Sequence, residues 1–170
     1  MRYNEFVNEG IHDPAIFKVV FIVGGPGSGK STVAKMLGLS AMGFVNINSD
    51  LALKHLMNKN KLQLNMPPEE KEKRDVVRTR AKELTTSKMS NAIDGRLGLF
   101  IDGTGEDYSK IESLNSNLQE LGYDSYLVIV YAPLEVALAN NAKRERQVPT
   151  STVKTKWEGA VRNIDNFTEL

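Results

Sequence analysis

Nine residues, "GGPGSGKST" at positions 24–32, constrain this chain more than any other stretch. They directly follow "FKVVFIV", residues 17–23, a continuous β-branched run typical of a strand that is buried on both faces. A helix is predicted to follow the glycine-rich turn, over residues 30–39. This succession of strand, turn and helix favours an α/β protein.

The rest of the chain repeats the alternation. Further strands are predicted over residues 44–47, 97–102 and 125–132. Helices are predicted around residues 51–57, over residues 67–92 and after Pro133. Two more are predicted from apolar residues at helical spacing, one along Ile111, Leu114, Leu118 and Leu121 and one along Val153, Trp157, Ala160 and Ile164. The pattern predicts a mostly parallel sheet of about four to five strands with helices on both faces, and a ligand site at the carboxyl ends of the strands. Residues 17–170 are predicted to form this single domain, and residues 1–16 an N-terminal extension.

Two nucleotide-binding patterns contain glycines at this spacing, and one lysine separates them. The dinucleotide pattern G-x-G-x-x-G needs a third glycine where this chain has Lys30, whereas residues 24–31 meet the phosphate-loop pattern G-x-x-x-x-G-K-[ST] in full. Asp50 lies 20 residues after Lys30, where a dinucleotide site would hold a ribose. A dinucleotide pyrophosphate does not require a lysine there, so we interpret the stretch as a phosphate loop.

A phosphate loop binds a triphosphate through its backbone and a few side chains. Glycines let successive N–H groups turn toward the phosphates, and the lysine reaches the β- and γ-phosphates. The serine hydroxyl after the lysine is a ligand of Mg²⁺. The sequence therefore predicts an ATP site with Mg²⁺, in which Ser31 is a metal ligand and the nucleotide is held by Gly25, Pro26, Gly27, Ser28, Gly29, Lys30, Ser31 and Thr32.

The motifs after the loop distinguish the possible reactions. Residues 102–105 fit the D-x-x-G of GTP switches, but the guanine motif N-K-x-D is missing, because its nearest match ends in Lys61. Motor ATPases usually carry a glutamate directly after the strand-end aspartate, and here Gly103 follows Asp102. Phosphoryl transfer to an acceptor other than water is therefore favoured, while slow hydrolysis stays open.

Transfer needs a carboxylate that accepts the acceptor's proton and cations that neutralise the phosphoryl group. Asp50, after the second predicted strand, and the basic segment "NAKRER", residues 141–146, provide candidates. Each has a structural alternative. Ser49 or Asp50 would also cap a helix that begins at Leu51, and the basic residues would also suit a solvated helix end.

These motifs resemble the zeta-toxin-like kinases and the 5′-kinase domain of polynucleotide kinases, within the three-layer P-loop NTPase fold. "GFVNINSD", residues 43–50, is similar to a polynucleotide kinase segment whose aspartate is the general base, which implies that role for Asp50. "FIDGTG", residues 100–105, resembles the strand-end segment of both families and implies a metal-organising role for Asp102. "NNAKRERQVP", residues 140–149, resembles a lid segment, in which Arg144 is the best match to the lid arginine and Arg146 a weaker one.

The resemblance leaves the acceptor open. Polynucleotide kinases usually carry a basic residue before the general base and an arginine three positions after it, where this chain has Ser49 and Leu53. The cations of the predicted 67–92 helix would suit an acceptor groove, but the acidic residues among them favour a solvated face. A small molecule and a nucleic-acid end both stay possible as acceptors.

Composition adds mainly exclusions. The formal net charge of +1 does not demand a polyanionic partner, and the absence of cysteine excludes a disulfide-linked partner or a thiolate site. No apolar run approaches the length of a membrane span, so we expect a cytoplasmic protein without membrane attachment. The resulting hypothesis is an ATP-dependent kinase. A nucleotide-dependent switch or slow ATPase that acts through a partner, and a degenerate nucleotide-binding protein, are the alternatives.

Overall fold

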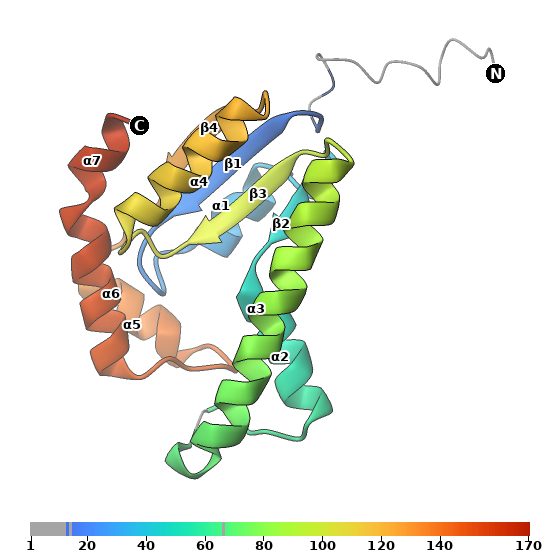
Figure 1. The fold of residues 1–170 in the computed structure, drawn as a ribbon. Helices are drawn as coiled ribbons and strands as arrows, with labels where there is room; N and C mark the ends of the chain where they lie inside the picture. Colours follow the sequence, from blue (N-terminus) through green and yellow to red (C-terminus); the bar gives the residue numbers. More distant parts are fainter. Residues whose placement is uncertain (1–12, 14, 66) are drawn as a thin grey trace.

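The structure, a computed structural model, describes residues 13, 15–65 and 67–170. Four parallel strands form one sheet in the order β2-β3-β1-β4 (Figure 1). The strands are β1 (Lys18–Val23), β2 (Val45–Ile47), β3 (Leu99–Gly103) and β4 (Asp124–Ile129). The helices are α1 (Lys30–Met36), α2 (Ser49–Lys59), the 3₁₀ turn η2 (Pro68–Glu70), α3 (Lys71–Asp94), α4 (Tyr108–Glu120), α5 (Leu134–Ala142), α6 (Thr150–Arg162) and α7 (Ile164–Thr168). This confirms the predicted α/β fold with its parallel sheet.

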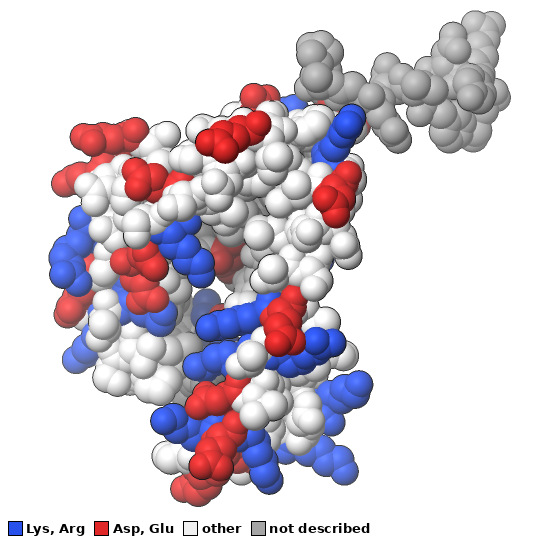
Figure 2. Space-filling model, viewed as in Figure 1, with Lys and Arg blue, Asp and Glu red and all other residues white. Residues whose placement is uncertain are grey.

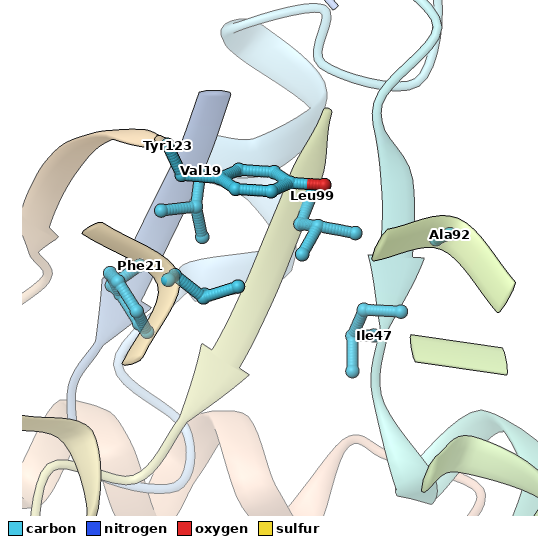
Figure 3. Packing of buried hydrophobic residues seen from close by; sticks show 7 residues of the cluster. Val19, Phe21, Ile47, Ala92, Leu99 and Tyr123 are labelled. Atoms are coloured by element: carbon cyan, nitrogen blue, oxygen red, sulfur yellow. The ribbon is translucent and has the colours of Figure 1, made fainter. Parts of the chain in front are cut away.

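The central strand β1 explains why the sheet is covered on both faces. Successive side chains of a strand point to opposite faces. Val19 and Phe21 pack with Leu99 and Leu118 on the face covered by α4 and the end of α3, and this core is drawn in Figure 3. Val20 and Ile22 pack on the other face, beneath α1. Both faces of the strand are thus buried in apolar cores, as its continuous apolar sequence predicts.

The arm formed by α2 and α3 extends beyond the sheet (Figure 1). It has an apolar core of its own, consisting of Leu53, Met57, Leu62, Val77 and Ala81. The opposite side of the molecule is built by α5, α6 and α7. Between these two parts lie the carboxyl ends of the strands.

Strand order brings the ends of three strands together. Ile22 of β1 pairs with Asp102 of β3, and Ile47 of β2 pairs with Ile101. The residues that follow β1 and β2 are therefore neighbours of Asp102. The chain builds β2 and β3 on one side of β1 and then β4 on the other, and ligands of open parallel sheets bind where the order reverses.

Several predicted boundaries are wrong. The first helix ends at Met36, not at residue 39, because Gly38 takes a left-handed φ of 65° and Leu39 turns back into the core. The second helix begins at Ser49, capped by Asn48, so neither Ser49 nor Asp50 is the cap. The last helix divides at Asn163, which places Ile164 on α7.

One side chain of a predicted apolar stripe is exposed. Leu121, the residue that caps the end of α4, is 54% exposed. Gly122 then takes a φ of 90°. No helix in the described part of the chain is long and apolar enough to cross a membrane. Of the predicted extension, residues 1–12 and 14 lie outside the described residues, and Ile16 forms an antiparallel bridge with Leu97.

Candidate active site

The phosphate loop, residues 24–32, forms a turn that only glycine permits at key positions. Gly27 and Gly29 take φ values of 83° and 100°, in the left-handed region that favours glycine. A Cβ atom on Gly27 would lie 2.1 Å from the carbonyl oxygen of Ala137 in α5. The loop thus packs tightly against α5, and Asn140 of that helix donates a hydrogen bond of 2.9 Å to the Gly27 carbonyl.

Lys30 is the charged centre of the loop. Its ammonium group donates to the carbonyl oxygens of Gly24 at 2.7 Å and Gly25 at 3.2 Å, and lies 3.7 Å from Asp102. Burial lowers the pKa of Lys30, and the Asp102 carboxylate partly opposes that effect. The cation is therefore held at the end of β1 by loop carbonyls and one carboxylate.

Asp102 is held from two sides. One oxygen faces Lys30, and the other accepts a hydrogen bond of 2.8 Å from the Asn48 side-chain amide. Burial raises the pKa of Asp102, Lys30 opposes this, and the negative charge of Asp50 raises it further. Ser31 is exposed at the start of α1. A hydroxyl and a carboxylate beside a phosphate-binding loop are hard oxygen donors, so the pair suits Mg²⁺.

Asn48 is a site residue that sequence reasoning missed. Its Oδ1 accepts a hydrogen bond of 2.8 Å from the backbone N–H of Asp50, which caps α2, while its Nδ2 donates to Asp102. One side chain thus connects the helix that carries Asp50 with the strand end that carries Asp102. An asparagine just before a predicted helix was the available signal.

Asp50 lies in the first turn of α2, and 60% of its side-chain surface is exposed. Its Oδ2 forms an ion pair with Arg146. Because its backbone N–H satisfies the cap, the carboxylate has no capping task in this structure and is free for other contacts.

The lid, residues 143–149, connects α5 to α6 and contacts α2 through two ion pairs. Arg146 pairs with Asp50, and Glu145 pairs with Lys54 one turn further along α2. Asn141 fixes the far end of the lid, because its side chain donates to the Val148 carbonyl at 2.8 Å and accepts from the Val148 N–H at 3.1 Å. The lid therefore connects α5 to the start of α2.

Arg144 is arranged differently from Arg146. It is exposed, and among the described residues no carboxylate lies within ion-pair distance of it. Burial and the mutual attraction of Lys30 and Asp102 have the larger effects on the pKa values of these two residues, but the charge of Arg144 also lowers both pKa values. For Asp102, the effect of Asp50 is also larger than that of Arg144. The stronger sequence match is thus the unpaired lid arginine, and the weaker match is the one that contacts Asp50.

Two further contacts support the loop from α6. The Trp157 indole N–H donates 2.8 Å to the Ala132 carbonyl, and a Cβ on Gly25 would lie 3.3 Å from the indole ring. Lys156 forms an ion pair with Glu106, in the connection after β3. Trp157 is partly buried behind the phosphate loop, so it serves packing there.

Comparisons with known proteins identify one family. The family model of the zeta toxins matches residues 8–169. No curated protein matches the chain.

Three solved structures share the fold. The first is the ATP complex of AvrRxo1-ORF1 with AvrRxo1-ORF2 (TM-score 0.75, 17% identity, 92% of this chain and 51% of that chain). The second is the Pnkp1/Rnl/Hen1 RNA repair complex (TM-score 0.66, 20% identity, 94% and 48%). The third is the PezAT toxin–antitoxin system of Streptococcus pneumoniae (TM-score 0.66, 15% identity, 89% and 64%).

The chain spans only about half to two thirds of the length of these solved chains. At such low identities the structural likeness shows a shared phosphate-loop kinase-like fold, and their substrates and partners belong to those proteins. The family model, in contrast, covers nearly the whole chain. This protein belongs to the zeta toxin family.

Proposed function

We propose that this protein is a kinase that moves the γ-phosphoryl group of ATP to a hydroxyl of a nucleotide-like, nucleotide-sugar or polynucleotide 5′-end acceptor. The observation that carries the proposal is the convergence, at one end of the sheet, of a phosphate-binding loop, a buried strand-end carboxylate and an exposed carboxylate. Lys30, Asp102 and Asp50 supply these parts.

The loop geometry supports a triphosphate as the donor. A Cβ atom on Gly27 would meet the Ala137 carbonyl of α5, so the loop is a tight turn whose backbone N–H groups can approach phosphate oxygens. Lys30 would exchange its loop carbonyls for phosphate oxygens, which carry full charge and bind an ammonium more strongly. Ser31 and Asp102 would hold Mg²⁺, which would neutralise charge on the phosphates.

Asp50 is the proposed general base. It would accept the acceptor's hydroxyl proton as the new O–P bond forms and the bond between the γ-phosphorus and the ADP oxygen breaks. Arg146 must first leave Asp50, because the ion pair occupies a carboxylate oxygen that would accept the proton. Arg144 would stabilise negative charge on the phosphoryl group during transfer.

A transfer assay tests the proposal. The protein would be incubated with γ-labelled ATP, Mg²⁺ and a panel of nucleosides, nucleotides, nucleotide sugars and 5′-hydroxyl oligonucleotides, with Lys30→Ala as the negative control. We expect label on one class of acceptor and none with Lys30→Ala. Release of inorganic phosphate alone would indicate a slow ATPase or switch, and ATP binding without turnover would indicate a degenerate nucleotide-binding protein.

A further inference from the structure

The charges of α3, which alternate in sign along the sequence, separate into sides on the helix. Four cations, at spacings of three, four and four residues, lie along one side, and we call them the basic stripe: Lys71, Arg74, Arg78 and Lys82. Glu72 and Glu83 lie on another side, about a third of a turn away from the stripe. Lys73 and Arg80 lie nearly opposite the stripe. The solvated face expected from the mixed charges therefore describes only part of this helix.

The direction of the stripe follows from the packing of α3. Met89 lies 18 residues after Lys71, which is about five turns, so both residues point the same way. Met89 packs against the core on the α4 face of the sheet. The neighbouring direction belongs to Val77 and Ala81, which pack against α2. The stripe thus faces inward, beside α2 and not away from the sheet.

The stripe lies beyond the strands at their carboxyl ends. Lys88 donates 2.9 Å to the carbonyl of Asn46 in β2, and α3 runs antiparallel to the strands (Figure 1). Residues 71–82 therefore project past the end of β2, on the side where Asp50 and Asp102 lie. Figure 2 shows a hollow between the two parts of the molecule, with Lys and Arg side chains on the side of α3.

The charge of the stripe is not neutralised locally. Within residues 13, 15–65 and 67–170, no carboxylate forms an ion pair with Lys71, Arg78 or Lys82, whereas Arg80 on the far side pairs with Glu83 at 2.9 Å. Arg74 donates one N–H to the Pro67 carbonyl at 3.0 Å and keeps its charge. Asp75 is the one acidic residue on the flank of the stripe, and it leaves an excess of positive charge.

We propose that the basic stripe binds the phosphates of a single-stranded nucleic acid whose 5′ end enters the site. From Lys71 to Lys82 the stripe is about 16 Å long, at 1.5 Å per residue. One strand of a duplex rises about 3.4 Å per phosphate along the axis, and a free single strand is more extended, so this length spans at most about four to five phosphates. A nucleotide sugar has only two adjacent phosphates and would occupy a fraction of it. The inference rests on the proposed kinase function and selects its acceptor class.

A matched pair of variants tests the stripe. Arg78→Gln with Lys82→Gln removes two charges from the stripe, and Lys73→Gln with Arg80→Gln removes two charges from the opposite side of the same helix. All four positions are exposed, and glutamine suits a helix, so thermal melting should show both proteins folded. Fluorescence anisotropy with six-nucleotide DNA and RNA strands, without ATP, measures binding directly.

The stripe variant should bind the strands at least about fivefold more weakly, and its salt slope should be smaller by about 1.4, at about 0.7 for each lost phosphate contact. The opposite-side variant should retain the parental affinity. In the transfer assay, KM should fall as the acceptor lengthens from one nucleotide to about five. Equal losses in both variants, or no dependence on strand length, would overturn the inference. Strand binding without transfer would instead refute the kinase proposal and leave the stripe in place.

Discussion

Asn48 allows a quantitative test, because its two hydrogen bonds act on different parts of the site. Asn48→Ala removes both bonds. The cap is worth about 1 kcal/mol, and a hydrogen bond to an ionised carboxylate about 1.5–3 kcal/mol. The free energy of unfolding should fall by about 2.5–4 kcal/mol, which for a chain of this size lowers the melting temperature by about 5–16 °C.

Asn48→Ser separates the two contributions. Serine caps a helix about as well as asparagine, but its shorter side chain does not reach Asp102. Thermal melting should therefore place Asn48→Ser above Asn48→Ala by about 1 kcal/mol, and below the parental protein by the bond to Asp102.

The pH profile of transfer provides an independent measurement. A donor to the ionised carboxylate lowers its pKa, so losing Asn48 should raise the pKa of Asp102 beyond the effect of burial. If ionised Asp102 is required, the acidic limb of the profile should move to higher pH in both variants. A parental pH profile together with parental stability in Asn48→Ser would refute the reasoning that Asn48 acts on Asp102.

Four other substitutions address the proposed roles. Asp50→Asn should keep the fold, because Asn48 provides the cap, and lower the transfer rate by about 10²–10⁴, whereas retained transfer would exclude a general base. Arg144→Ala should lower kcat by on the order of 10³ with little change in ATP affinity, as measured by steady-state kinetics. Arg146→Ala should change the free energy of unfolding by less than about 1 kcal/mol in thermal melting, because its partner Asp50 is 60% exposed. Burial lowers the pKa of Lys30 below 10.5, so folding stability should rise and ATP affinity should fall as the pH rises through that pKa. Asp102→Asn removes a charge that raises this pKa, so both changes should move to lower pH in calorimetric titrations. Unchanged curves would contradict the pairing of Lys30 with Asp102.

The sequence predicts the features that depend on local chemistry. A buried strand, glycines with positive φ and Lys30 follow one another without interruption, so the nucleotide-binding part can be read directly from residues 17–32. The place of Asp102 at a strand end is also local, because apolar residues precede it without a break. Predicting these elements does not require knowledge of any distant part of the chain.

The contacts between distant segments could not be predicted. Asn48 reaches Asp102 only because Ile47 pairs with Ile101, and strand register is a property of the whole sheet. The pairing of Arg146 with Asp50 depends on how the lid closes over α2. Sequence spacing places the cations of α3 on one side, but only the packing of Met89 and Val77 shows which way that side faces.

The separate core of the α2–α3 arm has a consequence for how such enzymes can diversify. Leu53, Met57 and Val77 pack with one another and not with the sheet, so substitutions there should add to substitutions in the main core without coupling to them. The arm bears the stripe, and the sheet bears the phosphate loop. Selection can therefore remodel the arm while the phosphate loop stays constant.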